Sequence, residues 1–377
     1  MSLPASDLAP DETDYARQIR NALRGLLFIA VIAAMYFARD FLLPVVLALF
    51  IAITLRPGIR LLAKYSIPPW LAACIFVIVL VVAGLSTFYL LSGPVASWIG
   101  QAPQLSQTFS EKFSGLRSSL DALTNLSEKL KSASASVDTA AVQEVMVREP
   151  ALPALFAMLT GYPIQFLITL IATLVISVFL MASGDLFYQK LVRILPTLTE
   201  RKRALHIVFD IENEVSAYVL TLSAINAGLG IIIAVTFHVL GMPLPYLWGL
   251  IVFLLNFIPY VGAVSGAALS GFMAVVTFDS LAYATFVPLA YSLWSLAESE
   301  IVKPQILGHR LQMNAVAILL SLAFWTWLWG IAGAAIAVPL LVTIKVFCEH
   351  IDGLSGLGEF IAARQIEKES PFTNEQV

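Results

Sequence analysis

The sequence predicts an all-α membrane protein: a polytopic helical bundle of about eight membrane segments, including short or re-entrant hairpins, with both termini in the cytoplasm. Of its 377 residues 59% are hydrophobic and only 12% are charged, whereas soluble domains are about a quarter charged. Several apolar runs also approach the roughly 20 residues that a helix needs to cross the hydrocarbon core. The formal net charge of −3 shows no basic surplus, so nucleic acid is not an expected partner.

The first membrane region, residues 25–92, follows a charged cytoplasmic segment at residues 1–24. Its apolar runs 25–38 and 41–55 are each too short to cross upright at about 1.5 Å per residue. They predict a pair of short tilted helices or a re-entrant hairpin. The run 70–92 is long enough to predict a full span.

Residues 93–162 predict an extracytoplasmic loop. Within it, leucine and phenylalanine recur at steps of three and four from Leu105 to Leu130, which predicts an amphipathic helix. Its apolar stripe could lie on the membrane surface, pack against the bundle or pair with a neighbouring subunit.

The second half begins with a predicted span at residues 163–183 and a cytoplasmic connector at 184–214, whose charged and apolar residues alternate at helical spacing. We expect this connector to lie along the lipid headgroups. The membrane segments of the core, residues 215–348, and a cytoplasmic tail, residues 349–377, complete the chain. The composition of the last residues predicts disorder. The core contains four apolar runs, at 215–240, 246–277, 280–297 and 313–344.

The orientation follows from the distribution of Lys and Arg. Sixteen of the 22 basic residues lie in segments that share one side of the membrane if the irregular apolar runs are hairpins. This predicts that both termini lie inside, in a multi-pass protein of the bacterial cytoplasmic membrane.

No motif for covalent or metal chemistry emerges from the sequence. It contains no phosphate-binding loop of an ATP-driven motor, no zinc-type spacing of histidines and no hydrolase signature. We therefore expect no enzyme activity, no cofactor and no metal site.

The apolar run 246–277 is interrupted at residues 256–262 by Asn-Phe-Ile-Pro-Tyr-Val-Gly. Proline removes a backbone donor, so the helix should kink or stop there. Freed backbone groups at membrane depth must face protein or a wet cavity, and half-helix ends can bind a solute. A plain structural kink is the alternative. The predicted substrate pathway comprises Asn256, Pro259, Tyr260 and Gly262, with the neutral polar residues Ser223, Asn226 and Asn314.

Acidic residues are absent from the interior of the apolar runs, so a mid-membrane carboxylate is not expected. Glu298 and Glu300 lie at the end of one run, beside Lys303. They are candidates for ion coupling, and the alternative is that they are solvated interfacial charges. The last run is interrupted by Gly330, Gly333 and Pro339, which predicts a hairpin.

Four stretches resemble one family. They are FLLPVVLALFIAITLRPGIRLL, VLGMPLPYLWGL, LLNFIPYVGAVSG and ESEIVKPQILGHRLQMNAVAILLSLAFWTWLWGIAGAAIAVPLLVTIKV. Together they look like the autoinducer-2 exporter family of membrane permeases over about residues 20–350. One departure is Leu220-Thr221, where many members have Gly-Gln, and it predicts a divergent subgroup.

The resemblance implies a symmetric homo-oligomer, for which a pentamer is one arrangement, and an extracytoplasmic segment between the third and fourth spans. Some members are associated with export of the quorum-sensing signal autoinducer-2, and others with exchange of sodium or lithium for protons. Carried onto this sequence, its motifs mark candidate substrate, coupling or gating residues: Asn256, Pro259, Tyr260, Gly262, Glu298, Pro304, Gly330, Gly333 and Pro339.

Three functional hypotheses remain open. The first is a secondary transporter or facilitated exporter of a small polar solute, with the lipid bilayer, the solute and further copies of the chain as partners. The second is a sodium (lithium)/proton antiporter. The third is a membrane scaffold that transports nothing and whose outer helix binds a partner.

Overall fold

The computed structural model describes residues 12–132, 163–183, 190, 193–307, 313–351 and 355–362. These residues are almost all helical and contain no strand. Five of the described helices are long and apolar enough to cross a membrane, which confirms the prediction of an all-α multi-pass membrane protein. The tail beyond Ala362 and residues 133–162 of the predicted outer loop lie outside the described part.

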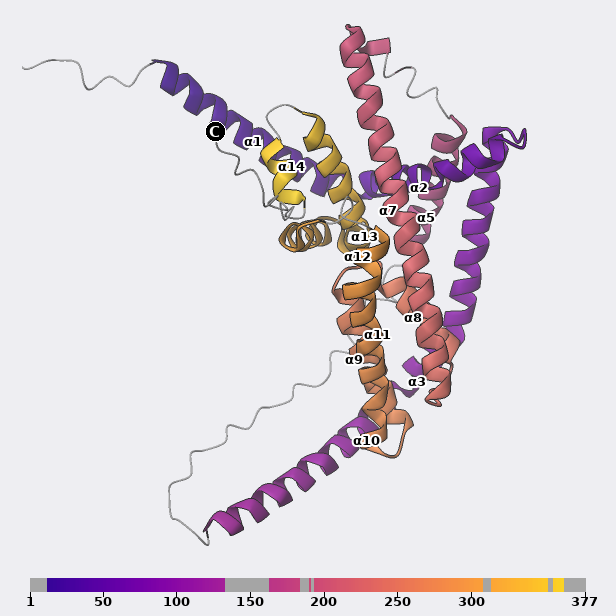
Figure 1. Cartoon of the computed structure of the whole chain (residues 1–377), viewed down its shortest axis with the longest axis vertical. Coiled ribbons are helices and arrows are strands. Elements are labelled where there is room, and N and C mark those ends of the chain that lie inside the picture. Colours follow the sequence, from indigo (N-terminus) through magenta and orange to yellow (C-terminus); the bar gives the residue numbers. More distant parts are fainter. Residues whose placement is uncertain are drawn as a thin grey trace, which may run out of the picture.

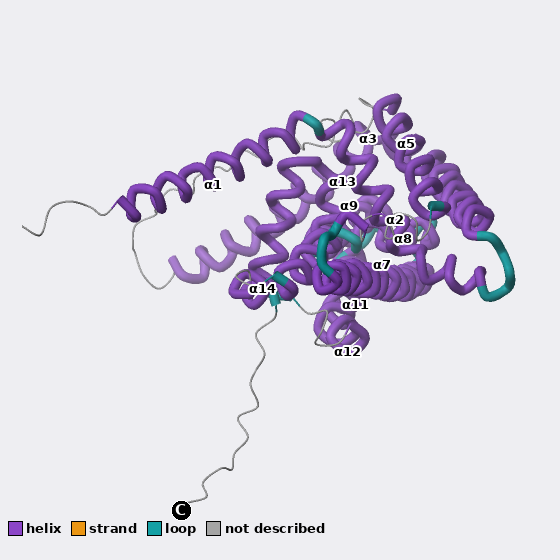
Figure 2. Tube along the Cα trace, turned by 90° about the horizontal axis from the view of Figure 1, so that it is seen from above, coloured by secondary structure: helices purple, strands orange, loops and turns teal. Residues whose placement is uncertain are grey.

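The first two helices are longer than predicted. Helix α1 (Glu12–Phe37) and helix α2 (Arg39–Ala63) have 26 and 25 residues and meet at Ala38. Both are long enough to cross a membrane, so the expectation of two short segments is wrong. The reason is that each helix continues into charged sequence where the apolar run has ended. Helix α1 extends away from the bundle (Figures 1 and 2).

Helix α3 (Pro69–Ser132) has 64 residues and continues through the point at which a loop was predicted. The amphipathic stretch is therefore the continuation of the membrane-spanning helix rather than a separate element. Helix α5 (Pro163–Ala182) follows and packs against α2 and α3.

Helix α7 (Leu198–Val239) is the long helix of the core (Figure 1). It begins in a capping box, in which Thr197 and Glu200 each bond the other's backbone N–H. Its 42 residues span about 63 Å at 1.5 Å per residue, about twice the hydrocarbon thickness. Residues 198–214 thus belong to the same helix as the predicted span 215–240, and their place along the headgroups stays a prediction.

The predicted break in the run 246–277 is confirmed and separates α8 (Pro245–Leu255) from α9 (Val261–Thr277). The Tyr283 hydroxyl, in α10 (Leu281–Ala284), donates to the Leu240 carbonyl over 3.1 Å at the end of α7. The segment between them therefore starts and ends at the same end of the bundle. Helices α8 and α9 form a re-entrant hairpin whose tip is residues 256–260.

A second hairpin lies within α13 (Ala315–His350). Gly330 has φ +64°, and the Ser321 hydroxyl donates to the Ala337 carbonyl over 2.9 Å. In a straight helix these two residues would be about 24 Å apart. The chain therefore folds back at Gly330, as the glycines predict. A side chain at Gly333 would collide with the Trp325 carbonyl, so the return helix packs closely on the outgoing one.

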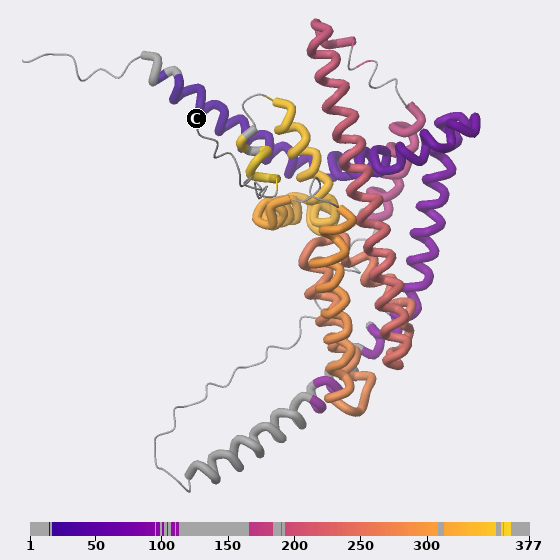
Figure 3. Tube along the Cα trace, in the orientation of Figure 1, coloured from indigo at the N-terminus to yellow at the C-terminus, as the bar shows by residue number. Residues whose placement is uncertain are grey.

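The remaining helices connect the two hairpins. They are α11 (Phe286–Ala297), the π-helix η1 (Glu298–Val302) and α12 (Lys303–Leu307). The last described helix, α14 (Ser355–Ile361), packs on α13, and both lie on the same side of the bundle as α1 (Figure 3). The core sits around α7, which packs against α2, α8, α11 and α13.

Candidate functional site

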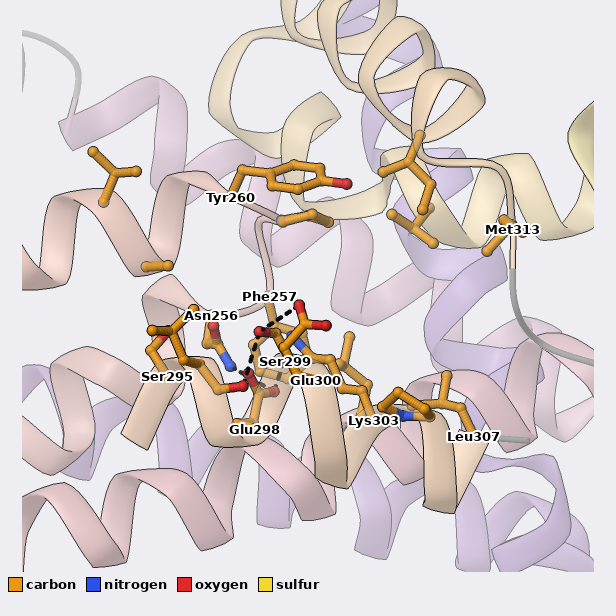
Figure 4. Close-up of a pocket in the computed structure, with 18 of the residues that line it drawn as sticks. Asn256, Phe257, Tyr260, Ser295, Glu298, Ser299, Glu300, Lys303, Leu307 and Met313 are labelled. Carbon is orange, nitrogen blue, oxygen red and sulfur yellow. Dashed lines mark hydrogen bonds and ion pairs between the residues drawn. The ribbon is translucent and has the colours of Figure 1, made fainter. Parts of the chain in front are cut away.

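A cavity of about 1010 Å³ lies at the tip of the α8–α9 hairpin. Its walls come from α7, from the hairpin tip, from the continuous α11, η1 and α12, and from α13. Figure 4 shows polar side chains of Asn256, Glu298, Ser299 and Glu300 gathered on one side, with Tyr260 on another. The remaining surface is largely apolar, with Leu222, Phe257, Leu296, Leu307, Met313, Ile318 and Val338.

The polar wall is a chain of hydrogen bonds that joins three elements. The Asn256 amide nitrogen donates to Asn226 Oδ1 on α7 over 2.9 Å and to Glu298 Oε1 over 3.1 Å. Lys303 Nζ lies 2.9 Å from the same carboxylate oxygen. The side chains of Glu298 and Lys303 are 5% and 29% exposed. This carboxylate is therefore buried and neutralised on the inner side of the cavity wall.

The π-helix explains why Glu298 and Lys303 can pair. They are five residues apart, which in an α-helix places side chains about 140° apart around the axis. The wider π turn bonds residue i to i+5 and brings both onto one face. Pro304, the next residue, has no N–H to continue the α-helical pattern. Single π turns of this kind are frequent at functional sites.

The hairpin tip requires glycine at two places. A Cβ at Gly262 would lie 2.6 Å from the Leu255 carbonyl oxygen, and one at Gly266 would collide with the Tyr291 hydroxyl. That hydroxyl donates to the Gly262 carbonyl over 3.0 Å. Tyr260 has φ +62°, a conformation that costs a non-glycine residue energy. The tip is thus a tightly packed turn that places Asn256 and Tyr260 at the cavity.

The structure brings part of the predicted site residues together at the cavity. Seven predicted residues line the cavity: Asn256, Pro259, Tyr260, Glu298, Glu300, Lys303 and Pro304. Asn226 lies directly behind Asn256 through the hydrogen bond above, and Gly262, in the first turn of α9, accepts from Tyr291.

The other predicted residues are engaged elsewhere. Ser223 donates to the Val219 carbonyl of its own helix. Asn314 caps the N-terminus of α13, accepting from Val316 N and donating to the Phe360 carbonyl. Gly330, Gly333 and Pro339 belong to the second hairpin, from which Ile318 and Val338 line the cavity instead.

One expectation about charge is wrong. Glu298 is 4% exposed rather than solvated at the interface, because the hairpin tip and α7 cover it. Glu300 is exposed, as a boundary charge should be. No periodicity in the sequence signals the difference between two glutamates that are two residues apart.

Two interactions outside the cavity were also missed. Glu212 on α7, 3% exposed, pairs with Arg56 at 2.8 Å and with Arg60 at 3.3 Å, which ties α7 to α2. The spacing of Arg56 and Arg60, one turn apart, is a signal for a shared acidic partner.

The outer part of α3 packs on the hairpin. The Trp98 and Trp248 ring centroids lie 5.7 Å apart, and those of Phe109 and Phe272 lie 5.1 Å apart. Lys112 Nζ donates to the carbonyls of Val275 and Phe278 at the C-terminal end of α9. Of the alternatives for the amphipathic stretch, packing against the bundle therefore holds for the described side chains between Trp98 and Lys112.

Comparison with known proteins places these features in context. A family model described as AI-2E family transporter matches residues 26–353. The "AI-2 transport protein TqsA" of Escherichia coli (strain K12) is 27% identical over 335 residues, which are 87% of this chain and 91% of that protein. The "Putative transport protein YhhT" of the same strain is 24% identical over 334 residues, 87% and 90% of the two chains. The "Putative transport protein YrrI" of Bacillus subtilis (strain 168) is 31% identical over 179 residues, 48% and 50% of the two chains.

Proposed function

This chain belongs to the AI-2E transporter family, and on that premise we propose that it moves a small polar organic solute across the membrane through the cavity at the α8–α9 tip. Membership makes it a membrane permease and implies that it is not an enzyme. The solute, the pathway and the assembly are the parts that we propose.

The observation that supports this pathway best is the combination of a break in the membrane hairpin with a polar wall. Solute sites are typically clefts of about 300–1,000 Å³, largely apolar, with a few fixed polar groups. This cavity has about that volume. Its fixed polar groups are the linked side chains of Asn256, Glu298 and Lys303. Such groups can hydrogen-bond hydroxyl and carbonyl groups of a solute, while the apolar wall contacts its carbon skeleton.

The first solute to test is autoinducer-2, because a relative that aligns over most of both chains carries the name of an AI-2 transport protein. Inside-out vesicles containing this protein should take up the signal, and an ionophore should abolish uptake if a gradient drives export. Pro259→Ala, which alters the hairpin tip, should reduce the flux without loss of protein from the membrane. Uptake no greater than that of empty vesicles would withdraw this solute from the proposal.

A second candidate function is exchange of sodium or lithium for protons. Glu298 supports it, because a buried carboxylate between Asn256 and Lys303 resembles the acidic groups that ion-coupled carriers use. Sodium-dependent proton movement in vesicles should then occur and should be lost in Glu298→Gln. Full exchange activity in that variant would refute this role of Glu298.

We further propose that the protein forms homo-oligomers in the bacterial cytoplasmic membrane. The exposed apolar side chains of α1, which include Leu23, Leu26 and Phe28, support contact with lipid or with a neighbouring copy. The mass of the detergent-solubilised protein, measured by light scattering, tests the assembly, and a monomer at all concentrations would exclude it.

A further inference from the structure

The positive and negative charges of the described side chains that line the cavity are unequal in number. Glu298, Glu300 and Lys303 are the charged groups of the lining that the structure describes. Lys303 is paired with Glu298 at 2.9 Å. Glu300 is exposed, and its contact is a 3.5 Å hydrogen bond from the Ser299 hydroxyl. With both acidic groups ionised, the part of the lining that the structure describes therefore carries one negative charge that no described lining cation neutralises.

The backbone N–H groups at the hairpin tip do not provide a site for an anion. The N-terminus of a helix often binds anions because its first N–H groups are free. Here the first two amides of α9 already have acceptors within the turn. Val261 N donates to the Pro259 carbonyl over 2.7 Å, and Gly262 N donates to the Ile258 carbonyl over 3.1 Å. A carboxylate or phosphate in the cavity would find these donors occupied.

We propose that the cavity selects solutes by charge, admitting neutral and cationic organic solutes and rejecting anions such as carboxylates and phosphate esters, with Glu300 as the selecting residue. This inference rests on the proposed function to the extent that the cavity is the solute pathway. The paired Lys303 holds Glu298 in place, so the free carboxylate of Glu300 sets the sign of the potential that a solute meets. Only the sign and place of this charge matter, so the same selection applies whatever the identity of the solute.

The sign of this potential can be measured without a known solute. In a protein with Cys74→Ala and Cys348→Ala, the substitution Ala263→Cys places one thiol in the cavity lining, on α9. Its thiolate displaces methanesulfinate from methanethiosulfonate reagents and forms a mixed disulfide. Two reagents of similar size are compared, one with a trimethylammonium group and one with a sulfonate group. Each rate is divided by the rate of the same reagent with free 2-mercaptoethanol.

After this normalisation, the cationic reagent should react faster than the anionic one. A series of substitutions should then move the ratio in a fixed order. Lys303→Gln raises it, Glu300→Gln lowers it toward one, and Glu300→Lys reverses it. A unit charge in or near water at this range should change the ratio by roughly two- to tenfold, and less at high salt. Asp279→Asn, an exposed acid at the outer end of the bundle, is the matched control and should change nothing.

Equal or faster reaction of the anionic reagent with the Ala263→Cys protein would overturn the proposal. A ratio of the two normalised rates that does not change when Glu300 is substituted would overturn it as well. Ser299→Cys provides a second thiol in the lining, on η1. If neither thiol reacts, the cavity is not an aqueous pathway, and the proposal falls with it. Failure of autoinducer-2 uptake combined with the expected ratios would reject that solute alone. Persisting uptake with the wrong ratios would reject charge selection alone.

Discussion

The ion pair between Glu298 and Lys303 should contribute measurably to stability, and a double-mutant cycle can isolate its contribution. Exposed pairs contribute about 0.2–1 kcal/mol, whereas removal of one partner of a buried pair costs about 3–5 kcal/mol. Here the carboxylate is 5% exposed and the lysine 29% exposed. The solvent that reaches Lys303 screens the pair, so we expect a coupling free energy of about 2 kcal/mol.

The cycle uses Lys303→Met, Glu298→Gln and the double variant, each unfolded with sodium dodecyl sulfate in mixed micelles. Lys303→Met should be the more damaging single change, because it leaves a buried carboxylate whose remaining partner among the described residues is the Asn256 amide. Glu298→Gln keeps an acceptor for that amide. The exposed pair of Arg39 and Asp40, with side chains 53% and 76% exposed, is the control and should show almost no coupling. Additive effects of Glu298→Gln and Lys303→Met would refute the coupling that we infer.

Three further predictions concern positions outside this pair. Gly262→Ala should abolish solute flux while the protein still inserts, because its Cβ would lie 2.6 Å from the Leu255 carbonyl oxygen; Gly228→Ala, with nothing within 4 Å, is the control in the same vesicle assay. Lys112→Met removes two hydrogen bonds to the end of α9 and should cost about 1–3 kcal/mol; faster hydrogen exchange confined to that end of α9 would be the signature, and unchanged exchange would contradict it. Gly330→Ala forces a side chain into φ +64° and ψ −144° and should cost about 1–3 kcal/mol in the same detergent unfolding, although no atom blocks its Cβ; an unchanged midpoint would show that the turn relaxes.

The two hairpins could be predicted from the sequence because each has a local cause. Pro259 and Gly262 interrupt one apolar run, and Gly330 and Gly333 interrupt the other. These residues act on the backbone where they stand, through a missing donor or a missing Cβ. The structure has its turns at these positions.

The burial of Glu298 could not be predicted in the same way. It depends on Asn256 and on Asn226, 42 and 72 positions away in the sequence, and on a π turn that no spacing rule announces. The ends of the helices were misjudged for a related reason. Hydrophobicity marks where a helix enters the hydrocarbon, whereas hydrogen bonding decides where the helix ends, and α7 begins at Leu198, 17 residues before the predicted span at 215–240.

Because α7 is uninterrupted, a small rotation of this helix near the cavity produces a larger displacement at its far end, where it can be measured. Leu198, its first residue, and Asn226, which bonds the hairpin tip, belong to one helix and are about 42 Å apart along its axis. A tilt of about 5° around Asn226 would therefore displace the Leu198 end by about 4 Å. A fluorophore at that end would convert a rearrangement too small to see beside the solute into a distance change that energy transfer can record in an intact membrane.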